Sequence, residues 1–332
     1  MIGDVLLGFL ALLALSVVGL VIFGQIARRN LGKRFPPPGA MLGLPGYRLH
    51  VRCEGRGPVM VLLQAGLNDF SLQWSRLQPL LAQETRTCSY DRAGLGWSEP
   101  SPSPPTITHA VDDLHAVVQS TSADAPLVLV GHSYGSLLVR LYAQQHPENI
   151  RAIVLLDPAN EFMAERMPGY AQALASAVDQ FRKLARLASL GLIALSSKSV
   201  PADRLDGEAL QQYRAVVAAG SFFKAAAAET AEMLNNLRAM QAAPQTALAS
   251  IPVVIISRGQ PEAIPGLPNK SAQTLEQTWA DLQTDLVNRL NARQIIAERS
   301  GHDIQLSQPE LVHDIIKRII QGDSWAHTAT QQ

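Results

Sequence analysis

The sequence of 332 residues has few of the features that indicate a metal, redox or nucleic-acid-binding protein. It has only two cysteines, Cys53 and Cys88, which are too few for a disulfide framework, and their flanking residues resemble strands rather than metal-binding clips. A single bridge between them is the less favoured alternative, because a pair of cysteines indicates little without geometry. Basic and acidic residues both number 28, so the formal net charge is zero and nothing in the balance points to nucleic acid as a partner.

Cofactor motifs are also missing from the sequence. No G-x-G-x-x-G follows a predicted strand, and neither a phosphate-binding loop nor a cluster of metal ligands is apparent. We therefore expect neither a cofactor nor a metal. Hydrophobic residues make up 47% of the chain and charged residues 17%, which suits a sizeable core together with an additional apolar segment.

That additional segment lies at the N-terminus. Val5–Gly24 is an uncharged run about as long as a bilayer-spanning helix. An apolar core helix would have polar residues that give it a solvated face, and this run has no such face. A signal peptide places its basic residues before the apolar run, whereas here they follow it, at Arg28, Arg29, Lys33 and Arg34. We predict a membrane anchor with a single pass. The positive-inside rule then favours a cytoplasmic catalytic domain, the outer or periplasmic side being the alternative.

Beyond the anchor, apolar runs that indicate buried strands alternate with stretches of helical spacing. We predict strands at 47–52, 59–64, 85–90, 127–130, 152–156, 253–256 and 294–297, and helices at 107–120, 136–145, 272–290 and 311–320. This alternation indicates a mostly parallel sheet with helices on both faces. Between about 161 and 248 strand signals are almost absent and the pattern is helical, so this insertion is expected to cover the edge of the sheet where ligands bind.

These patterns divide the chain into six parts. We expect an anchor with its basic flank at 1–34, a stiff proline-containing linker at 35–46, a core at 47–160 and 249–321, a helical cap at 161–248 and a tail at 322–332.

The pentapeptide Gly131-His132-Ser133-Tyr134-Gly135 joins a predicted buried strand to a predicted amphipathic helix. A sharp turn there would lift Ser133 above the sheet, and glycines two residues before and after it remove Cβ atoms that would clash. The helix that follows directs its N-terminal amides toward the same place. We therefore predict that Ser133 is a nucleophile.

Three motifs together carry a resemblance to a known family: G-H-S-Y-G, the stretch Tyr90-Asp91-Arg92-Ala93-Gly94-Leu95-Gly96-Trp97-Ser98, and Ser300-Gly301-His302. From about Tyr47 to Ile320 the chain resembles an α/β-hydrolase fold enzyme with a helical cap, a serine hydrolase of the esterase or lipase kind. In this family the aspartate and arginine of the second motif usually have a structural part, so Asp91 and Arg92 are expected to shape a turn.

The resemblance places the general base at His302, which follows a strand and comes after the serine in chain order. The other histidines fit surface or scaffold positions: His50, His109, His115, His132, His146, His313 and His327. Two carboxylates compete as the acid that orients the base. Asp157 ends a strand and resembles the acid site of the haloalkane dehalogenase branch, and Glu262 matches the more common family spacing. We favour Asp157 and keep Glu262 as its rival.

The oxyanion hole needs two donors. The amide of Tyr134 is one, and the loop Gln64–Asn68 should provide the other. Families of this kind often begin that loop with His-Gly, whereas this chain has Gln-Ala-Gly. We expect the amide of Leu67 to donate, with Gly66 giving the backbone room and the Asn68 side chain as a less favoured extra donor.

The resemblance implies hydrolysis of carboxylic esters through an acyl-enzyme. An aspartate at position 133 would have suggested epoxide or haloalkane chemistry, so the serine argues against both. Amide, lactone or carbon–carbon hydrolysis uses the same residues and stays open. A non-catalytic, membrane-tethered binding protein is the alternative of a different class. Apolar residues of the cap suggest an apolar pocket wall and a small apolar ester as substrate: Met163, Met167, Phe181, Phe222, Phe223, Met233 and Met240.

Overall fold

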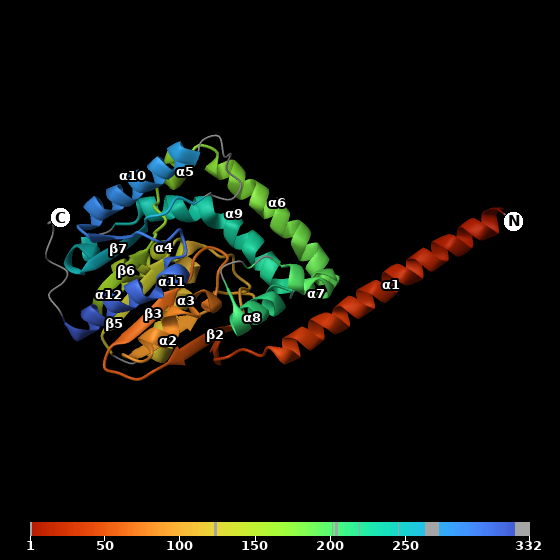
Figure 1. Cartoon of the computed structure of the whole chain (residues 1–332), viewed down its shortest axis with the longest axis horizontal. Coiled ribbons are helices and arrows are strands. Elements are labelled where there is room, and N and C mark those ends of the chain that lie inside the picture. The colour runs from red at the N-terminus through yellow and green to blue at the C-terminus, as the bar shows by residue number, and fades with distance from the viewer. Residues whose placement is uncertain are drawn as a thin grey trace.

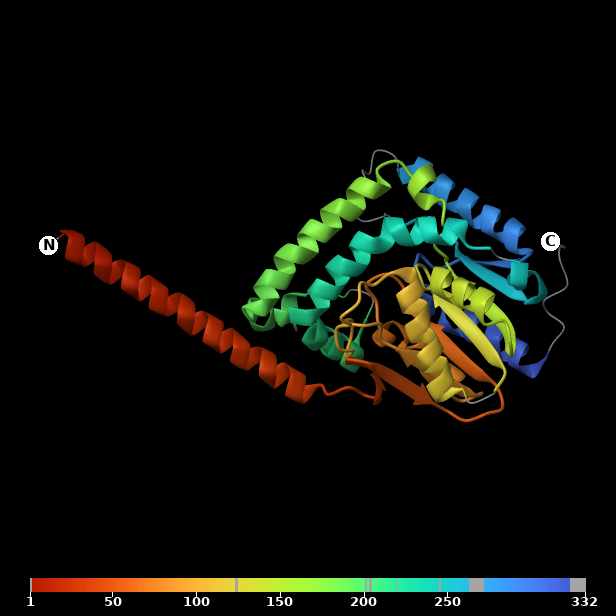
Figure 2. The same cartoon turned by 180° about the vertical axis from the view of Figure 1, so that it is seen from behind.

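The computed structural model describes residues 2–122, 125–200, 202, 205–218, 220–244, 246–262 and 272–322. They form one sheet with helices on both faces, a helical layer over one end of the strands, and a long N-terminal helix that projects from this body (Figures 1 and 2). Most of the predicted tail, residues 323–332 with His327, lies outside the described residues.

The sheet has eight strands in the order β1-β2-β4-β3-β5-β6-β7-β8. Pairing is parallel from β4 to β8, whereas β2 runs antiparallel to both β1 and β4. The described strands are β1 Ala40–Leu44, β2 Tyr47–Glu54, β3 Met60–Gln64, β4 Arg86–Tyr90, β5 Leu127–His132, β6 Ile150–Leu156, β7 Val253–Arg258 and β8 Arg293–Ala297. The mostly parallel sheet that we predicted is confirmed.

Helices cover both faces of this sheet. The described α-helices are α1 Ile2–Arg34, α2 Leu77–Leu81, α3 Ile107–Thr121, α4 Gly135–Gln145, α5 Met163–Arg166, α6 Tyr170–Ser189, α7 Leu192–Leu195, α8 Gly207–Val217, α9 Gly220–Ala242, α10 Ala272–Leu290, α11 Ile304–Ser307 and α12 Pro309–Gln321. The sequence pattern did not indicate α2 and α11, which are too short to show a helical period.

The core is divided in two by the sheet. Side chains alternate along a strand, so Leu127 and Leu129 of β5 pack toward α3, α4 and α10, whereas Val128 and Val130 pack toward α2 and α12. The same alternation in β3, β6 and β7 buries these strands on both faces. Two apolar layers therefore fix the strand ends on which the candidate site is built.

The insertion at 161–248 contains α5 to α9, and α6 and α9 pack along each other above the sheet (Figure 2). Six of the seven apolar cap residues named above are buried and Phe181 is partly buried, packed into clusters with the core or with one another. Their packing attaches the cap to the core and fills it.

Helix α1 is the one described helix that is long and apolar enough to cross a membrane. Its most apolar window has a mean hydropathy of 2.9 and is 0% buried, so the helix is not part of the core. An N-terminal signal sequence can also form an apolar helix of this kind. The last turns of α1 contact α7 and α8, and the rest of the helix extends away from the domain (Figure 1).

The expected linker at 35–46 is more ordered than we predicted. Ala40–Leu44 forms β1, which pairs antiparallel with β2 from Ala40 opposite Val51 to Leu44 opposite Tyr47. Five residues at the edge of a sheet, with a glycine among them, carry almost no alternation that would identify a strand. The prolines before β1 therefore lead into the sheet rather than through a plain spacer.

The two cysteines are bridged, and our preference for unpaired cysteines was wrong. Cys53 on β2 stands opposite Cys88 on β4, and a disulfide joins them. The two strands are neighbours in the sheet, but β3 comes between them in the sequence. No local pattern therefore shows that the cysteines face each other. The crosslink closes a loop across 35 residues and ties the antiparallel edge to the parallel sheet.

Replacing both cysteines, as Cys53→Ala with Cys88→Ala, is expected to lower the free energy of unfolding by about 2–4 kcal/mol, because the unfolded chain loses a crosslink. Urea denaturation of the solubilised protein measures this loss. Reductant should destabilise the wild type and leave the double variant unchanged. Reaction of both thiols in unfolded, unreduced protein would contradict the bridge.

Candidate active site

Ser133 occupies the turn between β5 and α4. Its φ is 49°, in the left-handed region that a residue with a Cβ rarely adopts. The backbone N–H of Ser133 donates to the carbonyl of Leu156, and its own carbonyl accepts from Ser136 and Ala159, which fixes this conformation. The serine therefore stands at the carboxyl end of the sheet on a strained, well-braced turn.

The glycines on both sides of this turn are required by crowding. A Cβ on Gly131 would lie 2.8 Å from the carbonyl oxygen of Gly135, and one on Gly135 would lie 2.4 Å from the carbonyl oxygen of Gln64. Both contacts are with backbone atoms, which side-chain movement cannot relieve. The spacing of two glycines around the serine thus follows from the close approach of the β3 loop to α4.

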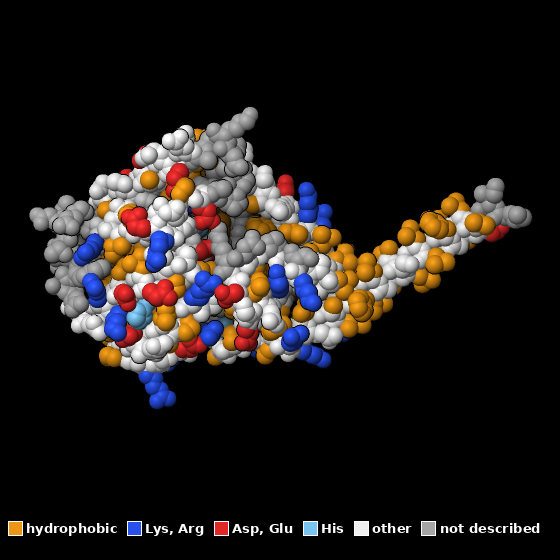
Figure 3. Space-filling model, viewed as in Figure 1, with side chains coloured by type: hydrophobic (Ala, Val, Ile, Leu, Met, Phe, Trp, Pro, Cys, Tyr) orange, Lys and Arg blue, Asp and Glu red, His pale blue; other side chains and the backbone are white. Residues whose placement is uncertain are grey.

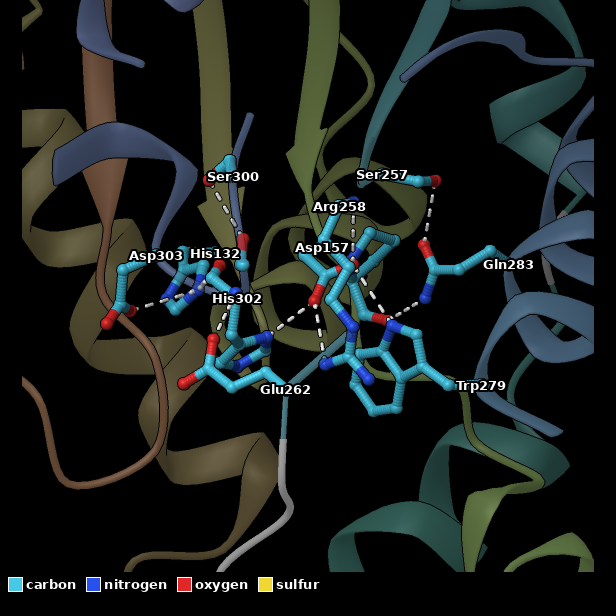
Figure 4. A network of polar contacts seen from close by, with 12 residues as sticks. His132, Asp157, Ser257, Arg258, Glu262, Trp279, Gln283, Ser300, His302 and Asp303 are labelled. Carbon is cyan, nitrogen blue, oxygen red and sulfur yellow. Dashed lines mark hydrogen bonds and ion pairs between the residues drawn. The ribbon is translucent and has the colours of Figure 1, made fainter. Parts of the chain in front are cut away.

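His302 lies beside His132, the neighbour of Ser133 in the chain, with their ring centroids 4.6 Å apart, and its ring points toward Asp157, which follows β6 (Figure 4). Its Nδ1 is 2.6 Å from Oδ2 of Asp157, and because an ionised carboxylate only accepts, the imidazole N–H is placed on Nδ1. This leaves Nε2 as the nitrogen able to take a proton. In this conformation the Ser133 hydroxyl makes no hydrogen bond to another described residue. Such contacts often tighten only when substrate binds.

Asp157 is fully buried and has several hydrogen-bond donors around it. Its Oδ1 accepts from the indole of Trp279 at 3.0 Å and from the backbone N–H of Arg258 at 3.2 Å, and the Arg258 guanidinium is 3.5 Å from Oδ2. Burial raises the pKa of Asp157, but the hydrogen bond and charge of His302, followed by the Arg258 charge, lower it more, so the net pKa is below the ordinary value. The carboxylate therefore stays ionised beside the imidazole.

The pKa of His302 shifts the other way. Burial lowers it, but the hydrogen bond and negative charge of Asp157 raise it further, and the net pKa lies above the ordinary value. An imidazole with a raised pKa binds a proton more strongly. The pair therefore has the polarity required of a general base and its orienting acid.

Glu262, the rival acid, also reaches His302 but at a different atom. Its Oε2 accepts the backbone N–H of His302 at 2.6 Å. Among the described residues, Asp157 alone hydrogen-bonds the imidazole ring, whereas Glu262 supports the backbone of the loop that carries His302.

The loop after β3 lies against the turn at Ser133. A Cβ built on Gly66 would be 3.4 Å from the Cβ of Ser133, so little space separates the two segments. The amides of Leu67 and Tyr134 donate no hydrogen bond to another described residue. The Asn68 side chain instead donates to the Thr230 hydroxyl at 2.9 Å. One N–H of this side chain is therefore engaged by the cap.

Arg92 supports the loop after β3 through hydrogen bonds to its backbone. Its guanidinium donates to the carbonyls of Ala65 and Gly66 at 2.8 and 2.6 Å, and to the carboxylate of Glu229 on α9 at 2.5 and 2.9 Å. The same carboxylate accepts the backbone N–H of Asn68 at 2.6 Å. Arg92 therefore does more than shape a turn, because with Glu229 it joins the cap to the predicted oxyanion loop.

Asp91 has the structural part that we expected. Its two carboxylate oxygens accept the backbone N–H groups of Ser71 and Trp97 at 2.8 and 2.9 Å, and it also contacts Nδ1 of buried His50 at 2.8 Å. These contacts tie the turn after β4 to the neighbouring loop and to β2.

His132, next to the serine, points into a second polar group behind the site (Figure 4). Burial, followed by the nearby charge of His302, lowers its pKa to about 4, so it is neutral at pH 7. Its Nδ1 lies 2.7 Å from the Gln73 amide nitrogen and its Nε2 lies 3.0 Å from the carbonyl oxygen of His302. Asp69, His132 and Asp303 each place one possible ligand atom within 4.8 Å of the others. Both His132 nitrogens are already engaged, so we assign no metal to this group.

Sequence reasoning missed four residues that hold this site together. Gln73, Glu229 and Trp279 come from elements far apart in the chain, and no local pattern marks them. Arg258 carried a usable signal, because a charged residue that ends a buried strand stands at the same sheet edge as Asp157.

The comparison with known proteins agrees with this geometry. Residues 58–247 match the model of the alpha/beta hydrolase fold family. The chain belongs to the α/β-hydrolase fold family. The resemblance drawn from the three sequence motifs is thus confirmed, as is the enzyme class, an α/β-hydrolase.

Individual relatives of this α/β-hydrolase are distant. The chain is 24% identical over 261 residues to the uncharacterised protein YqjL of Bacillus subtilis, which covers 78% of the chain and 83% of YqjL. It is similar in fold to the Cif epoxide hydrolase from Acinetobacter nosocomialis (TM-score 0.69, 13% identity, 90% of this chain and 96% of that one). A carboxylesterase structure from Nitrososphaera gargenis is also similar (TM-score 0.58, 17% identity, 86% and 100%). The chain spans only 20% of a longer relative, the probable transporter efuK of Hormonema carpetanum.

Replacing the two carboxylates separately should distinguish their roles. Asp157→Asn is expected to lower kcat by about 10³–10⁴-fold, because the imidazole loses the negative charge that fixes its tautomer and stabilises the imidazolium. Glu262→Gln keeps an acceptor oxygen for the loop amide and should cost about tenfold or less. Steady-state kinetics on a chromogenic ester measures both, and a larger loss in Glu262→Gln would make Glu262 the acid.

The pH profile gives a second readout for the same pair. The base must be neutral to act, so kcat/KM should rise with pH through the pKa of His302. Removing the Asp157 charge lowers that pKa, and the rising limb should move to lower pH in Asp157→Asn while staying in place in Glu262→Gln.

Proposed function

We propose that this α/β-hydrolase cleaves carboxylic esters of apolar substrates through an acyl-enzyme on Ser133. The observation that supports this most is the His302 imidazole, hydrogen-bonded through Nδ1 to buried Asp157 and lying beside the strained turn that carries the serine. A base held in one tautomer near a half-buried serine hydroxyl is the arrangement that activates a serine.

In the first half of the reaction, Ser133 Oγ attacks the ester carbonyl carbon and His302 Nε2 takes the hydroxyl proton. The carbonyl oxygen becomes an oxyanion, which the amides of Leu67 and Tyr134 stabilise. His302 then gives its proton to the departing alkoxide as the carbon–oxygen bond breaks. An alcohol leaves, and the acyl group remains on Ser133.

In the second half, His302 takes a proton from a water molecule that attacks the acyl carbonyl. The tetrahedral intermediate collapses, the bond to Ser133 Oγ breaks, and the proton returns to the serine. The carboxylic acid leaves and the enzyme is restored. Asp157 stays ionised throughout and stabilises the imidazolium that forms in each half.

The residue at position 133 separates this reaction from another one found among similar folds. Epoxide hydrolases are among the structural neighbours, but an alkyl-enzyme route uses a carboxylate nucleophile, and this chain has a serine there. A carboxylesterase is among the same neighbours, and esters fit the serine. The preference for apolar substrates rests on the composition of the cap.

Hydrolysis of p-nitrophenyl esters should be abolished by Ser133→Ala, with a fall in kcat of about 10⁴-fold or more. Acyl chains longer than acetyl are expected to be the better substrates. Release of p-nitrophenol, measured across a series of chain lengths, checks both expectations.

Ser136→Ala is the matched control, since among the described residues this buried hydroxyl hydrogen-bonds the Gly131 carbonyl at 3.0 Å and no other group. It should keep ester turnover and labelling by a fluorophosphonate probe. Labelling at Ser133 without ester turnover would redirect the function to amides, lactones or carbon–carbon bonds. A folded wild type that is not labelled would leave only the non-catalytic binding protein.

We propose further that α1 anchors the enzyme in a membrane with the catalytic domain on the non-cytoplasmic side. The basic flank of α1 favours the cytoplasm, whereas the Cys53–Cys88 bridge favours an oxidising compartment. The bridge carries more weight, because disulfides are rare in cytoplasmic proteins and the positive-inside bias has exceptions.

A C-terminal fusion to alkaline phosphatase should therefore be active in cells that express the full chain. The same fusion to a chain lacking residues 1–34 should be inactive, because it stays in the cytoplasm. Activity of a cytoplasmic reporter at the C-terminus would place the domain inside and contradict the proposal.

A further inference from the structure

A cavity of about 390 Å³ lies between α1, the cap helix α9 and the segment that follows β4. Arg28 of α1 and Lys224 of α9 line it together with Ser189, Pro100 and Ala225. A groove of about 370 Å³ between α6 and α9 shares Ser189 and Lys224 with the cavity, so the two are continuous.

This cavity is separate from the catalytic centre. Ser133, Asp157 and His302 are absent from its lining, and the buried ion pair of Arg92 with Glu229 forms its inner wall. The oxyanion loop lies behind that pair. A ligand bound in this cavity would therefore be distinct from the ester group that reacts at Ser133.

Basic side chains outnumber acidic ones around the cavity. It is lined by Arg28, Arg92 and Lys224 and by two carboxylates, of which Glu229 is paired with Arg92 and Asp113 accepts a hydrogen bond from the Tyr47 hydroxyl. Arg28 and Lys224 form no ion pair with another described residue.

Two further arginines line the adjoining groove. Arg182 has only an exposed contact of 3.7 Å with Asp179, and Arg186 also faces the groove. Cations above largely apolar walls match a ligand with an anionic head and an apolar body.

The position of the cavity relative to α1 identifies a source for such a ligand. The apolar run of α1 ends at Gly24, which packs directly on the backbone of Gly191, where a Cβ would lie 2.8 Å from a carbonyl atom. Gln25 donates to the carbonyl of Ser189 at 2.6 Å. Arg28 follows one helical turn later, about 6 Å along the axis. With α1 in a bilayer, the cavity opens at the depth of the lipid headgroups.

Two exposed leucines mark the same end of the cap. Leu187 and Leu190, at the end of α6 beside the α1 contact, are 41% and 43% exposed. Outside α1, the structure describes just one other exposed large hydrophobic side chain, Ile296. Basic side chains gather near the junction of the cap with the apolar helix (Figure 3). Exposed leucines among basic residues are typical of a surface that rests on an anionic membrane.

We propose that this cavity binds an anionic phospholipid of the leaflet that surrounds α1. The phosphate lies between Arg28 and Lys224, and the acyl chains lie along the apolar surface of α1. The proposal rests on the membrane anchor proposed above, and it is independent of the reaction at Ser133.

Native mass spectrometry of the full chain, released from nanodiscs of equal phosphatidylcholine and phosphatidylglycerol, tests the site. The wild type should retain phosphatidylglycerol preferentially. Lys224→Glu should reduce the retained phosphatidylglycerol by about tenfold, because it reverses one of the two phosphate-binding charges.

Lys183→Glu is the matched control, since Lys183 is an exposed lysine on the same cap that lines neither the cavity nor the groove. It should retain the lipid as the wild type does. Fluorophosphonate labelling of the same samples checks the catalytic site separately, so a failure of the ester proposal leaves the lipid measurement readable.

Three outcomes would overturn the lipid site. The first is equal retention of the two lipids by the wild type, and the second is a loss of phosphatidylglycerol in Lys183→Glu as strong as in Lys224→Glu. The third is displacement of the lipid by soluble glycerol phosphate that binds as tightly, which would make the cavity a small-anion site.

Discussion

The buried pair of Arg92 and Glu229 joins three parts of the molecule that are otherwise separate. Both side chains are nearly inaccessible to solvent, and burying two charges is costly unless every donor and acceptor is satisfied. Here the guanidinium donates to the carboxylate and to two carbonyls of the loop after β3, and the carboxylate accepts one amide of the same loop. These partners can be met only when α9 lies in its observed place, so cap position and loop conformation are set together.

The same dependence explains how the candidate site is arranged. Ser133, Asp157 and His302 all follow strand ends at one edge of the sheet, and the two core layers fix those ends rigidly. The loop that we propose to bind the oxyanion follows β3, and Leu67 packs against the core. It is also held by the cap through Glu229 and Thr230, and by Gln73, whose side-chain oxygen accepts the Gly66 amide at 3.1 Å. The cap is therefore coupled directly to this loop.

Sequence patterns predicted the parts of this arrangement that depend on local chemistry. The strand–helix alternation gave the sheet, and two glycines around a serine marked the turn at Ser133, because the crowding there is between near neighbours. They did not separate Asp157 from Glu262, since both carboxylates reach His302 and only the orientation of its ring distinguishes them. Glu229, Trp279 and the Cys53–Cys88 bridge depend on which elements lie side by side, and that order is set by the whole fold rather than by any short segment.

The crosslink between β2 and β4 also has a mechanical consequence. Tension applied through α1 would reach the domain at β1 and then at β2, the two antiparallel strands at the edge of the sheet. Backbone hydrogen bonds at an edge separate one after another when a strand is peeled. The covalent bond at Cys53 interrupts that sequence and passes the load directly to Cys88 on β4. The segment between the two cysteines, which includes β3 and the loop after it, would then be bypassed by the force, and extension could continue only by removing β4 from the parallel sheet.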